Sequence, residues 1–148
     1  MRLIVEFDVN NCYLNLCDMN LDRFDYLKLA RSGDIDLGRS QALTNYNEEY
    51  CVDMDYFKMP RCVDIDNAVG ICFRGCDFSK TEELSVSEAR FVRFDDVFFP
   101  KKIDLSKCNE VLCGEAYGEQ EECLDGLEEI KFKNKAQADD FFYEYYWF

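Results

Sequence analysis

The chain of 148 residues contains no histidine, only two prolines and seven glycines. Histidine is the usual general base near neutral pH and the commonest metal ligand in proteins. Its absence excludes serine and cysteine triads of the ordinary kind, and also zinc-hydrolase sites built on histidine. An enzyme of this composition would have to work with carboxylates, lysine, tyrosine or thiols.

Positive charge is also scarce. The chain has 17 lysines and arginines against 31 aspartates and glutamates, which gives a net charge of −14. A surface of this kind repels nucleic acids and anionic membranes and attracts basic proteins. We therefore expect a basic protein partner, typically a nucleic-acid-binding enzyme, with no direct contact to nucleic acid or to a membrane.

Targeting and membrane-spanning segments are not recognisable in the sequence. The N-terminal stretch reaches an acid at Glu6, and no apolar run approaches the length of a membrane span. The nine cysteines are odd in number and lack a secretory context, so we expect reduced thiols rather than disulfides. The expected location is the cytoplasm, or the host cytoplasm if the protein is phage-encoded.

What the chain does have is enough apolar material for a core. Hydrophobic residues make up 48% of the sequence and aromatic residues 16%, well above the content of a disordered chain. No linker or break in composition divides the chain. We therefore predict one acidic domain over residues 1–148.

Alternation of apolar and polar residues predicts several strands. They are expected over residues 3–9, 50–57, 62–65, 69–74, 90–99, 111–113 and 127–133. A short helix is predicted over residues 22–30, a loop over 34–47, and a turn or helical turn over 81–83.

The chain is predicted to end in a helix. Asn134 suits the N-cap, Gln137 the capping-box partner, and Asp139 and Asp140 the positive helix start. Together these elements predict an α+β fold: a mainly antiparallel sheet with a C-terminal helix and one or two short additional helices.

A short echo stands out within the sequence, because CVDMD at residues 51–55 recurs as CVDID at residues 62–66. If the two segments pair as a hairpin, Asp53, Asp55, Asp64 and Asp66 share one face. Three interpretations remain open: a solvated strand face, a divalent metal site, or a regular anionic row. The calcium-loop pattern does not continue after either pair, and the echo is too short a period for a solenoid.

Carboxylate chemistry has a second candidate in Glu129-Ile130-Lys131. A strand-borne Glu-x-Lys with an upstream acid, here Asp104 or Asp125, is typical of one large class of magnesium-dependent nucleases. Alternating acids and lysines are also common on any outward strand face.

Cysteine spacing allows a zinc site in principle. Cys12 and Cys17 match Cys108 and Cys113 in spacing, but the usual two-residue knuckle is missing. Buried or incidental thiols are the alternative, and we expect no metal and no cofactor.

The strongest local charge feature is the segment 110–129, which holds eight acids and no base. It contains Glu115, Glu119, Glu121 and Glu122, which we take as candidate partner-binding residues together with the four aspartates of the echo. An extended negative surface of this kind imitates a nucleic-acid backbone and fits a basic groove.

Aromatic residues crowd the C-terminus, with seven among residues 141–148. One helix face can bury some of them in the core. Tyr143, Tyr146 and Trp147 fall off that face and are candidate anchors for a partner or for self-association.

These features favour a small acidic binding protein over an enzyme. Our specific hypothesis is an inhibitor from a phage or mobile element that blocks a restriction or CRISPR-type defence enzyme through its basic groove. Two alternatives remain: a metal-dependent phosphodiesterase or nucleotidyl enzyme that uses carboxylates, and an immunity or antitoxin protein that neutralises a basic toxin.

Overall fold

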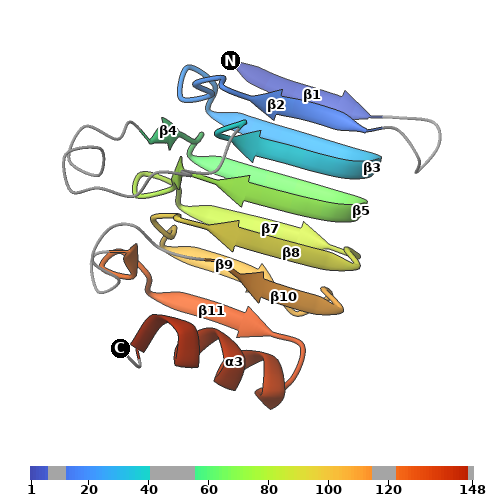
Figure 1. Cartoon of the computed structure of the whole chain (residues 1–148). Helices are drawn as coiled ribbons and strands as arrows, with labels where there is room; N and C mark the ends of the chain where they lie inside the picture. Colours follow the sequence, from blue (N-terminus) through green and yellow to red (C-terminus); the bar gives the residue numbers. More distant parts are fainter. Residues whose placement is uncertain (7–12, 41–55, 115–122, 147–148) are drawn as a thin grey trace.

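The strands of this protein stack one above another in parallel, and a helix closes one end of the stack (Figure 1). The computed structural model describes residues 1–6, 13–40, 56–114 and 123–146, with side chains in the last range described up to residue 143. Every strand pairing recorded there is parallel, which makes the architecture a β-solenoid.

Most strands have two to five residues, and two have 13. In chain order they are β1 (Arg2–Glu6), β2 (Leu14–Cys17), β3 (Tyr26–Gly38), β4 (Phe57–Lys58), β5 (Cys62–Arg74), β6 (Cys76–Asp77), β7 (Glu83–Ser87), β8 (Phe91–Asp95), β9 (Lys102–Leu105), β10 (Glu110–Cys113) and β11 (Glu129–Phe132). The helix α3 spans Lys135–Tyr146.

The strand pairings define three faces. The first face contains β1, the N-terminal part of β3, the N-terminal part of β5, β7, β9 and β11. The second face contains β2, the C-terminal parts of β3 and β5, β8 and β10. The third face is the narrowest, with β4 paired to β6 and a bridge from Asp77 to Phe98.

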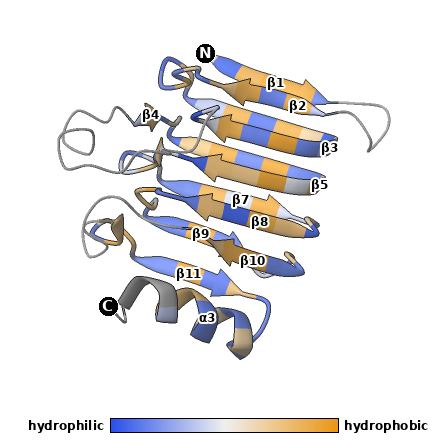
Figure 2. Cartoon of the chain, in the orientation of Figure 1, coloured by the Kyte–Doolittle hydropathy of each residue, from blue (hydrophilic) through white to orange (hydrophobic). Residues whose placement is uncertain are grey.

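The core is a set of apolar columns along the stack, because residues at the same register position lie above one another. On the first face the register joins Leu3, Leu27, Val63, Leu84, Ile103 and Ile130. On the second face it joins Leu16, Leu37, Phe73, Phe94 and Cys113. Figure 2 shows the corresponding alternation of hydrophobic and hydrophilic residues along the strands. Each fully buried side chain of this size contributes about 1.5–3 kcal/mol.

A run of phenylalanine rings continues the core toward the helix. The ring centroids of Phe78 and Phe73 are 5.2 Å apart, those of Phe73 and Phe94 are 5.5 Å apart, and those of Phe94 and Phe99 are 5.1 Å apart. Phe99 then meets Phe141 of α3 at 5.3 Å. This spacing is within the range at which aromatic pairs attract beyond simple burial.

The corners of the solenoid depend on left-handed backbone conformations. Between the first and second faces the chain turns at Arg31, Asn67 and Glu88, with φ angles of 54°, 58° and 57°. Because residues with a Cβ disfavour this conformation, and asparagine tolerates it better than most, the arginine and the glutamate carry a local cost. The turn keeps each coil in register with the next.

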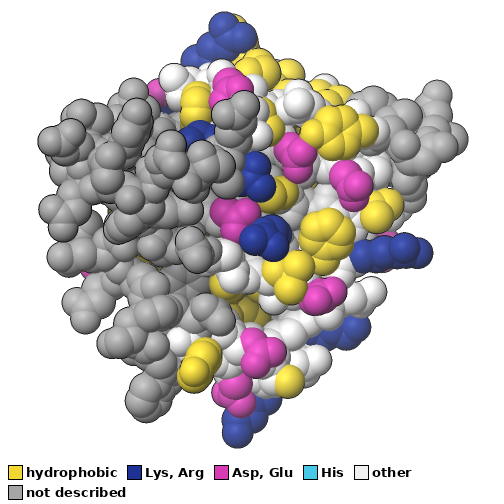
Figure 3. Space-filling view, viewed as in Figure 1, with side chains coloured by type: hydrophobic (Ala, Val, Ile, Leu, Met, Phe, Trp, Pro, Cys, Tyr) yellow, Lys and Arg dark blue, Asp and Glu magenta, His cyan; other side chains and the backbone are white. Residues whose placement is uncertain are grey.

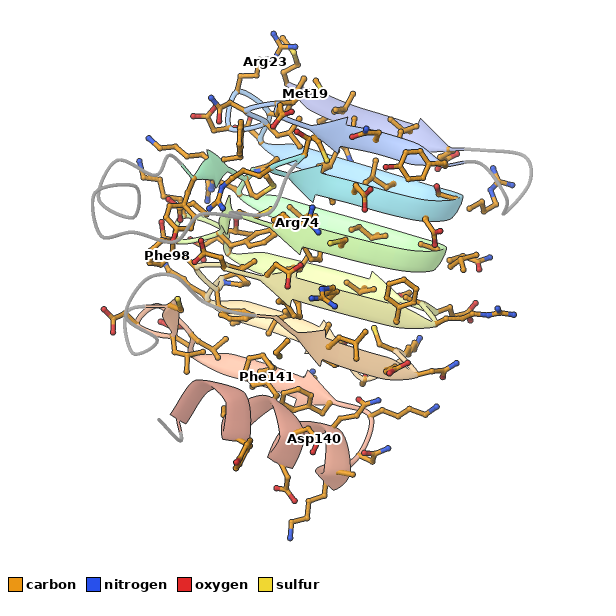
Figure 4. The ribbon with its side chains drawn as sticks, viewed as in Figure 1. Met19, Arg23, Arg74, Phe98, Asp140 and Phe141 are labelled. Carbon is orange, nitrogen blue, oxygen red and sulfur yellow. The ribbon has the colours of Figure 1, made fainter. Side chains whose placement is uncertain are left out.

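Helix α3 begins as the sequence predicts. Asn134 Oδ1 accepts a hydrogen bond of 3.0 Å from the Gln137 N–H, while Gln137 Oε1 accepts one of 3.3 Å from the Lys133 N–H. The expected acidic first turn is wrong, because the helix begins at Lys135 and its first turn contains no acid. Phe141 is 1% exposed and fixes the helix to the end of the core (Figure 4).

The predicted mainly antiparallel α+β fold is wrong. The nine-stranded sheet is built from parallel strands, and residues 22–30 form a turn followed by the start of β3 instead of a helix. The predicted loop over 34–47 is also wrong in part, because Asp34–Gly38 continues β3. A side chain pattern of period two is the same for parallel and antiparallel pairing, so the alternation could not reveal the direction.

Several strands were predicted in place. The segments 62–65 and 69–74 fall in the two halves of β5, the predictions over 90–99 and 127–133 contain β8 and β11, and the prediction over 111–113 lies within β10. Strands β2, β6, β7 and β9 were missed, and β3 was predicted as a helix and a loop. Among the described residues, no helix has the length and apolar character that crossing a bilayer requires.

Candidate functional site

Asp64 and Asp66 lie on the outer side of the first face, in β5, as the alternation predicts. Asp64 is half-buried and accepts a hydrogen bond of 3.2 Å from the Tyr26 hydroxyl, whereas Asp66 is exposed. Their register neighbours are Lys28 and Ser85 for Asp64, and Ala30 and Ser87 for Asp66. The expected hairpin partner is therefore replaced by two parallel strands.

The outer side of the first face carries charges of both signs. Its basic residues are Arg2, Lys28, Lys102 and Lys131, and its acidic residues are Glu6, Asp64, Asp66, Glu83, Asp104 and Glu129. In one column a base lies between two acids, with Lys102 between Glu83 and Glu129, and in the next column Lys28 neighbours Asp64 and Lys131 neighbours Asp104. The described part of this face is thus a mixed ladder and not a uniform anionic row.

Most of the other predicted partner-binding residues lie outside the described residues. These are Asp53, Asp55, Glu115, Glu119, Glu121, Glu122 and Trp147. Tyr146 belongs to α3, but its side chain is outside the described set, whereas the side chain of Tyr143 is 64% exposed on α3. Tyr143 is therefore the one predicted aromatic anchor whose accessibility the structure records.

The Glu-x-Lys candidate does come together with one of its proposed acids. Lys131 of β11 is the register partner of Asp104 in β9, and Lys131 Nζ lies 3.7 Å from Glu129 Oε1. The pKa of Asp104 is lowered although partial burial opposes it, because Ser106 donates hydrogen bonds from its N–H and hydroxyl and Lys131 is close. Within the described ranges no three acidic or thiol side chains come together as a metal site would require.

The described cysteines are mostly packing residues. Cys76, Cys108 and Cys123 are buried, and burial raises the pKa of the Cys108 thiol to about 12. Cys17 and Cys113 stand at opposite ends of the second face, in β2 and β10, so they do not form the zinc pairing that their spacing allows. Cys12 lies outside the described residues.

The second face carries a polar cluster that the sequence analysis missed, centred on Asp95 at the end of β8. Its Oδ2 accepts a hydrogen bond of 2.8 Å from Arg93 Nε and lies 3.7 Å from Arg74 Nε. Cys72 Sγ is 4.0 Å from the same oxygen. Burial, and then the charge of Asp95, raise the pKa of the Cys72 thiol to about 11, so this thiol stays protonated at neutral pH and is a poor nucleophile.

A second missed cluster lies at the corner between the second and third faces. Asp96 accepts a hydrogen bond of 3.0 Å from Arg39 Nη2 and another of 2.8 Å from the Tyr56 hydroxyl. The side chains of Arg39 and Asp96 are 12% and 2% exposed. Gly75, with φ +64°, makes room for the arginine, because a Cβ there would lie 2.4 Å from Arg39 Nε.

This cluster holds together the two ends of an insertion. Arg39 precedes and Tyr56 follows the segment 41–55, and both side chains bind one carboxylate from the coil of β8. The signal in the sequence is weak, since Asp95-Asp96 reads as an ordinary acidic pair. The cluster is structural: its charges are paired with each other and not presented to solvent.

A cavity of about 220 Å³ lies between the third face and the start of the first. Three basic residues line it, Lys58, Arg61 and Lys80. None of them forms an ion pair with another described residue. Three acids also line it, Asp22, Asp25 and Asp77. The opposing charges leave it without a dominant sign, so it does not define a class of ligand.

Charge is distributed unevenly between the solenoid and the remaining segments. All 17 bases belong to the described ranges, whereas nine of the 31 acids and no base belong to residues 7–12, 41–55 and 115–122. On the visible face of the solenoid, acidic and basic side chains are interspersed (Figure 3). The described body is therefore much closer to neutral than the whole chain.

The described residues that precede two of these segments lie at the same corner of the solenoid. Segment 41–55 follows the end of β3 and segment 115–122 follows β10, and both strands end on the second face. The chain returns to the third face in both cases, at β4 and at Cys123, whose carbonyl accepts a hydrogen bond from the Phe99 N–H. Comparison with protein-family models, curated proteins and solved structures finds no match for this chain.

Proposed function

We propose that this protein is a small acidic binding protein whose partner is a basic, nucleic-acid-handling protein. The observation that carries the proposal is the charge distribution. Acids and bases are more nearly equal in number in the described solenoid than in the whole chain, whereas the segments 41–55 and 115–122, which follow described residues at one corner, contain acids and no base. Because these segments contain no lysine or arginine, their acids have no base within the same segment. In this proposal they match a basic groove of the partner, which accelerates association and makes it sensitive to salt.

The rigid stack suits this role. In a β-solenoid each coil contacts its neighbours, so a segment inserted between two faces leaves the packing of the other coils unchanged. The Arg39–Asp96–Tyr56 cluster fixes the ends of the segment 41–55 to the body, so both ends of this acidic segment start from a defined position. Fixed ends reduce the ordering cost of binding.

The partner is proposed to be a restriction or CRISPR-type defence enzyme, with the protein acting in the cytoplasm of a host cell as the product of a phage or mobile element. Attraction between acidic segments and a basic surface would also support the alternative, in which the protein is the immunity or antitoxin partner of a basic toxin. The carboxylate enzyme is the weaker candidate, because among the described residues no three acidic or thiol side chains lie together as a metal site would require.

The test begins with cross-linking and capture of partners from a bacterial lysate, followed by mass spectrometry. The captured partner should be basic, should be released as salt rises, and should lose its bound nucleic acid when the protein is added. A partner that binds DNA or RNA and this protein at the same time would contradict the proposal, as would salt-insensitive capture.

Matched variants locate the contact. Glu121→Gln with Glu122→Gln should weaken binding of the captured partner several-fold, whereas Asp139→Asn with Asp140→Asn removes the same charge from the exposed side of α3 and should have little effect. Asp64→Asn with Asp66→Asn tests the first face separately. Equal effects from all three pairs would show that only net charge matters and would contradict a defined contact.

A further inference from the structure

The two ends of the solenoid differ. At one end α3 covers the last coil, with Phe141 buried against Phe99 and Phe132. At the other end β1 and β2 each pair with β3 only, and no described residue covers their second edges (Figure 1). An open strand edge presents unpaired N–H and C=O groups, and natural proteins normally cover or block such edges.

Apolar side chains are exposed at this open end. The inward residues of the first coil, Leu3, Val5, Leu14 and Leu16, are only partly buried, while their register neighbours in β3, Leu27, Leu29, Ile35 and Leu37, are at most 1% exposed. Four of the five large apolar or aromatic residues that are exposed in the described ranges also belong to this end: Met1, Ile4, Tyr13 and Met19. Figure 4 shows Met19 at the same end of the stack.

The sequence of β1 is complementary to itself when reversed. Arg2, Ile4 and Glu6 alternate with Leu3 and Val5, and the first three lie on the outer side of the strand. If a second β1 pairs antiparallel about Ile4, Arg2 lies opposite Glu6 of the other copy, and Glu6 opposite its Arg2. Leu3 then meets Val5, and Ile4 meets Ile4, whose side chain is 50% exposed in the single chain.

The contacts that Arg2 and Glu6 make within the single chain are weak enough to be replaced by contacts with a second copy. Glu6 Oε2 lies 3.8 Å from Arg31 Nη2, with both side chains about half exposed, and Arg2 stacks over the Tyr26 ring at 4.5 Å. Exposed ion pairs of this type contribute little. Opposite charges directly across an antiparallel pair are favourable, and like charges are unfavourable.

From these observations we infer that two copies of this chain associate end to end, with β1 of one copy paired antiparallel to β1 of the other about a two-fold axis at Ile4. Such an interface is isologous, so it closes at two copies and does not grow into a fibre. The two sheets then form one continuous sheet with a capping helix at each outer end. The inference is independent of the proposed acidic binding function.

Charge reversal tests the register of the pairing. The native protein should sediment as a reversible dimer, and R2E and E6R should each weaken dimerisation by about tenfold or more, because each places two like-charged pairs across the interface. The double variant R2E/E6R should dimerise again, since the reversed pattern is also self-complementary. An equimolar mixture of R2E and E6R should form a mixed dimer.

Controls separate this interface from general charge effects and from misfolding. K107E makes the same change of charge as R2E, at an exposed turn after β9, and should leave the dimer intact. The far-ultraviolet circular dichroism spectrum should be unchanged in every variant. A native protein that remains a monomer across the dilution series would overturn the inference, and so would a dimer that R2E and E6R do not affect.

A covalent trap provides a second readout. Residues directly opposite each other in an antiparallel pair have Cα atoms within the range that a disulfide spans. I4C should therefore give an oxidised, reducible dimer that the native protein does not give under the same oxidant. Failure of I4C to cross-link in a protein that still dimerises would show that another surface forms the dimer.

Discussion

Tyr56 donates a hydrogen bond of 2.8 Å to Asp96, a carboxylate 40 residues later in the chain. Asp96 lies at the end of the β8 coil, while Tyr56 ends the long insertion that follows β3. Arg39 reaches the same carboxylate from the other end of that insertion. The buried carboxylate of Asp96 therefore binds the residues on both sides of an insertion that belongs to another coil.

Asp96→Asn should destabilise the fold by about 3 kcal/mol, because it leaves the Arg39 guanidinium buried without a counter-charge. Urea denaturation measures the change. The control is Glu82→Gln, which removes an exposed partner of Lys101 and should cost less than about 1 kcal/mol. Adding Arg39→Met to Asp96→Asn should recover part of the lost stability. Equal effects of Asp96→Asn and Glu82→Gln would contradict the buried pair.

Phe141→Ala should loosen the helical cap. The ring is 1% exposed and lies 5.3 Å from both Phe99 and Phe132, so its removal leaves a cavity and should cost about 3–5 kcal/mol. Hydrogen exchange should rise most in β11 and α3. Tyr143→Ala, two residues later on the exposed side of the helix, should change stability by less than about 0.5 kcal/mol. Uniform exchange throughout the solenoid would argue against a separate cap.

Stability should fall as the pH rises from the ordinary thiol range toward 11. Burial raises the pKa of Cys72 to about 11, so the folded state keeps a proton that the unfolded chain releases nearer pH 8.5. The stabilisation is complete below the unfolded pKa and is lost as the pH approaches the folded pKa. Cys72→Ser should flatten this slope in urea denaturation. Between pH 6 and 8 the free energies of unfolding of the native protein and of Cys72→Ser should depend on pH in the same way. If they still do so above pH 9, Cys72 is not the group that titrates.

Glu88→Gly should stabilise the protein by about 0.5–1 kcal/mol, because Glu88 adopts a left-handed backbone with φ 57° that glycine reaches without steric cost. Glu83→Gly in β7 is the matched control and should destabilise by about 0.5–1 kcal/mol, since a glycine within a strand only adds unfolded-state entropy. The midpoints of thermal unfolding should therefore move in opposite directions. A loss of stability with Glu88→Gly would show that its side chain matters more than its backbone.

Local strand signals in the sequence were informative where apolar and polar residues alternate cleanly. The two halves of β5 and the inward residues Ile130 and Phe132 of β11 were predicted from alternation alone. Strand β9 was missed because its four residues include Lys102 and Asp104, which leaves only Ile103 and Leu105 as apolar positions. Four residues give too little alternation to distinguish a strand from a turn.

The repeat itself was hidden by insertions. Val63, Leu84 and Ile103 follow one another at about 20 residues, but Leu27 and Val63 are separated by 36 residues because the segment 41–55 intervenes. The echo at 51–66 is a similarity of sequence, whereas the structural repeat is a similarity of position along the stack. Residues that meet only through this stacking, such as Arg39 and Asp96, could not be paired from the sequence.

The stacking order also determines how the molecule would respond to a mechanical load. Pulled from its two termini, a stack of this kind is expected to peel from the β1 end, where the first coil has a neighbour on one side only. Each released coil of about 20 residues would lengthen the chain by roughly 7 nm, because an extended residue spans about 3.4 Å. The force trace would then show a series of steps, interrupted where the Arg39–Asp96–Tyr56 cluster fastens the second coil to the fourth.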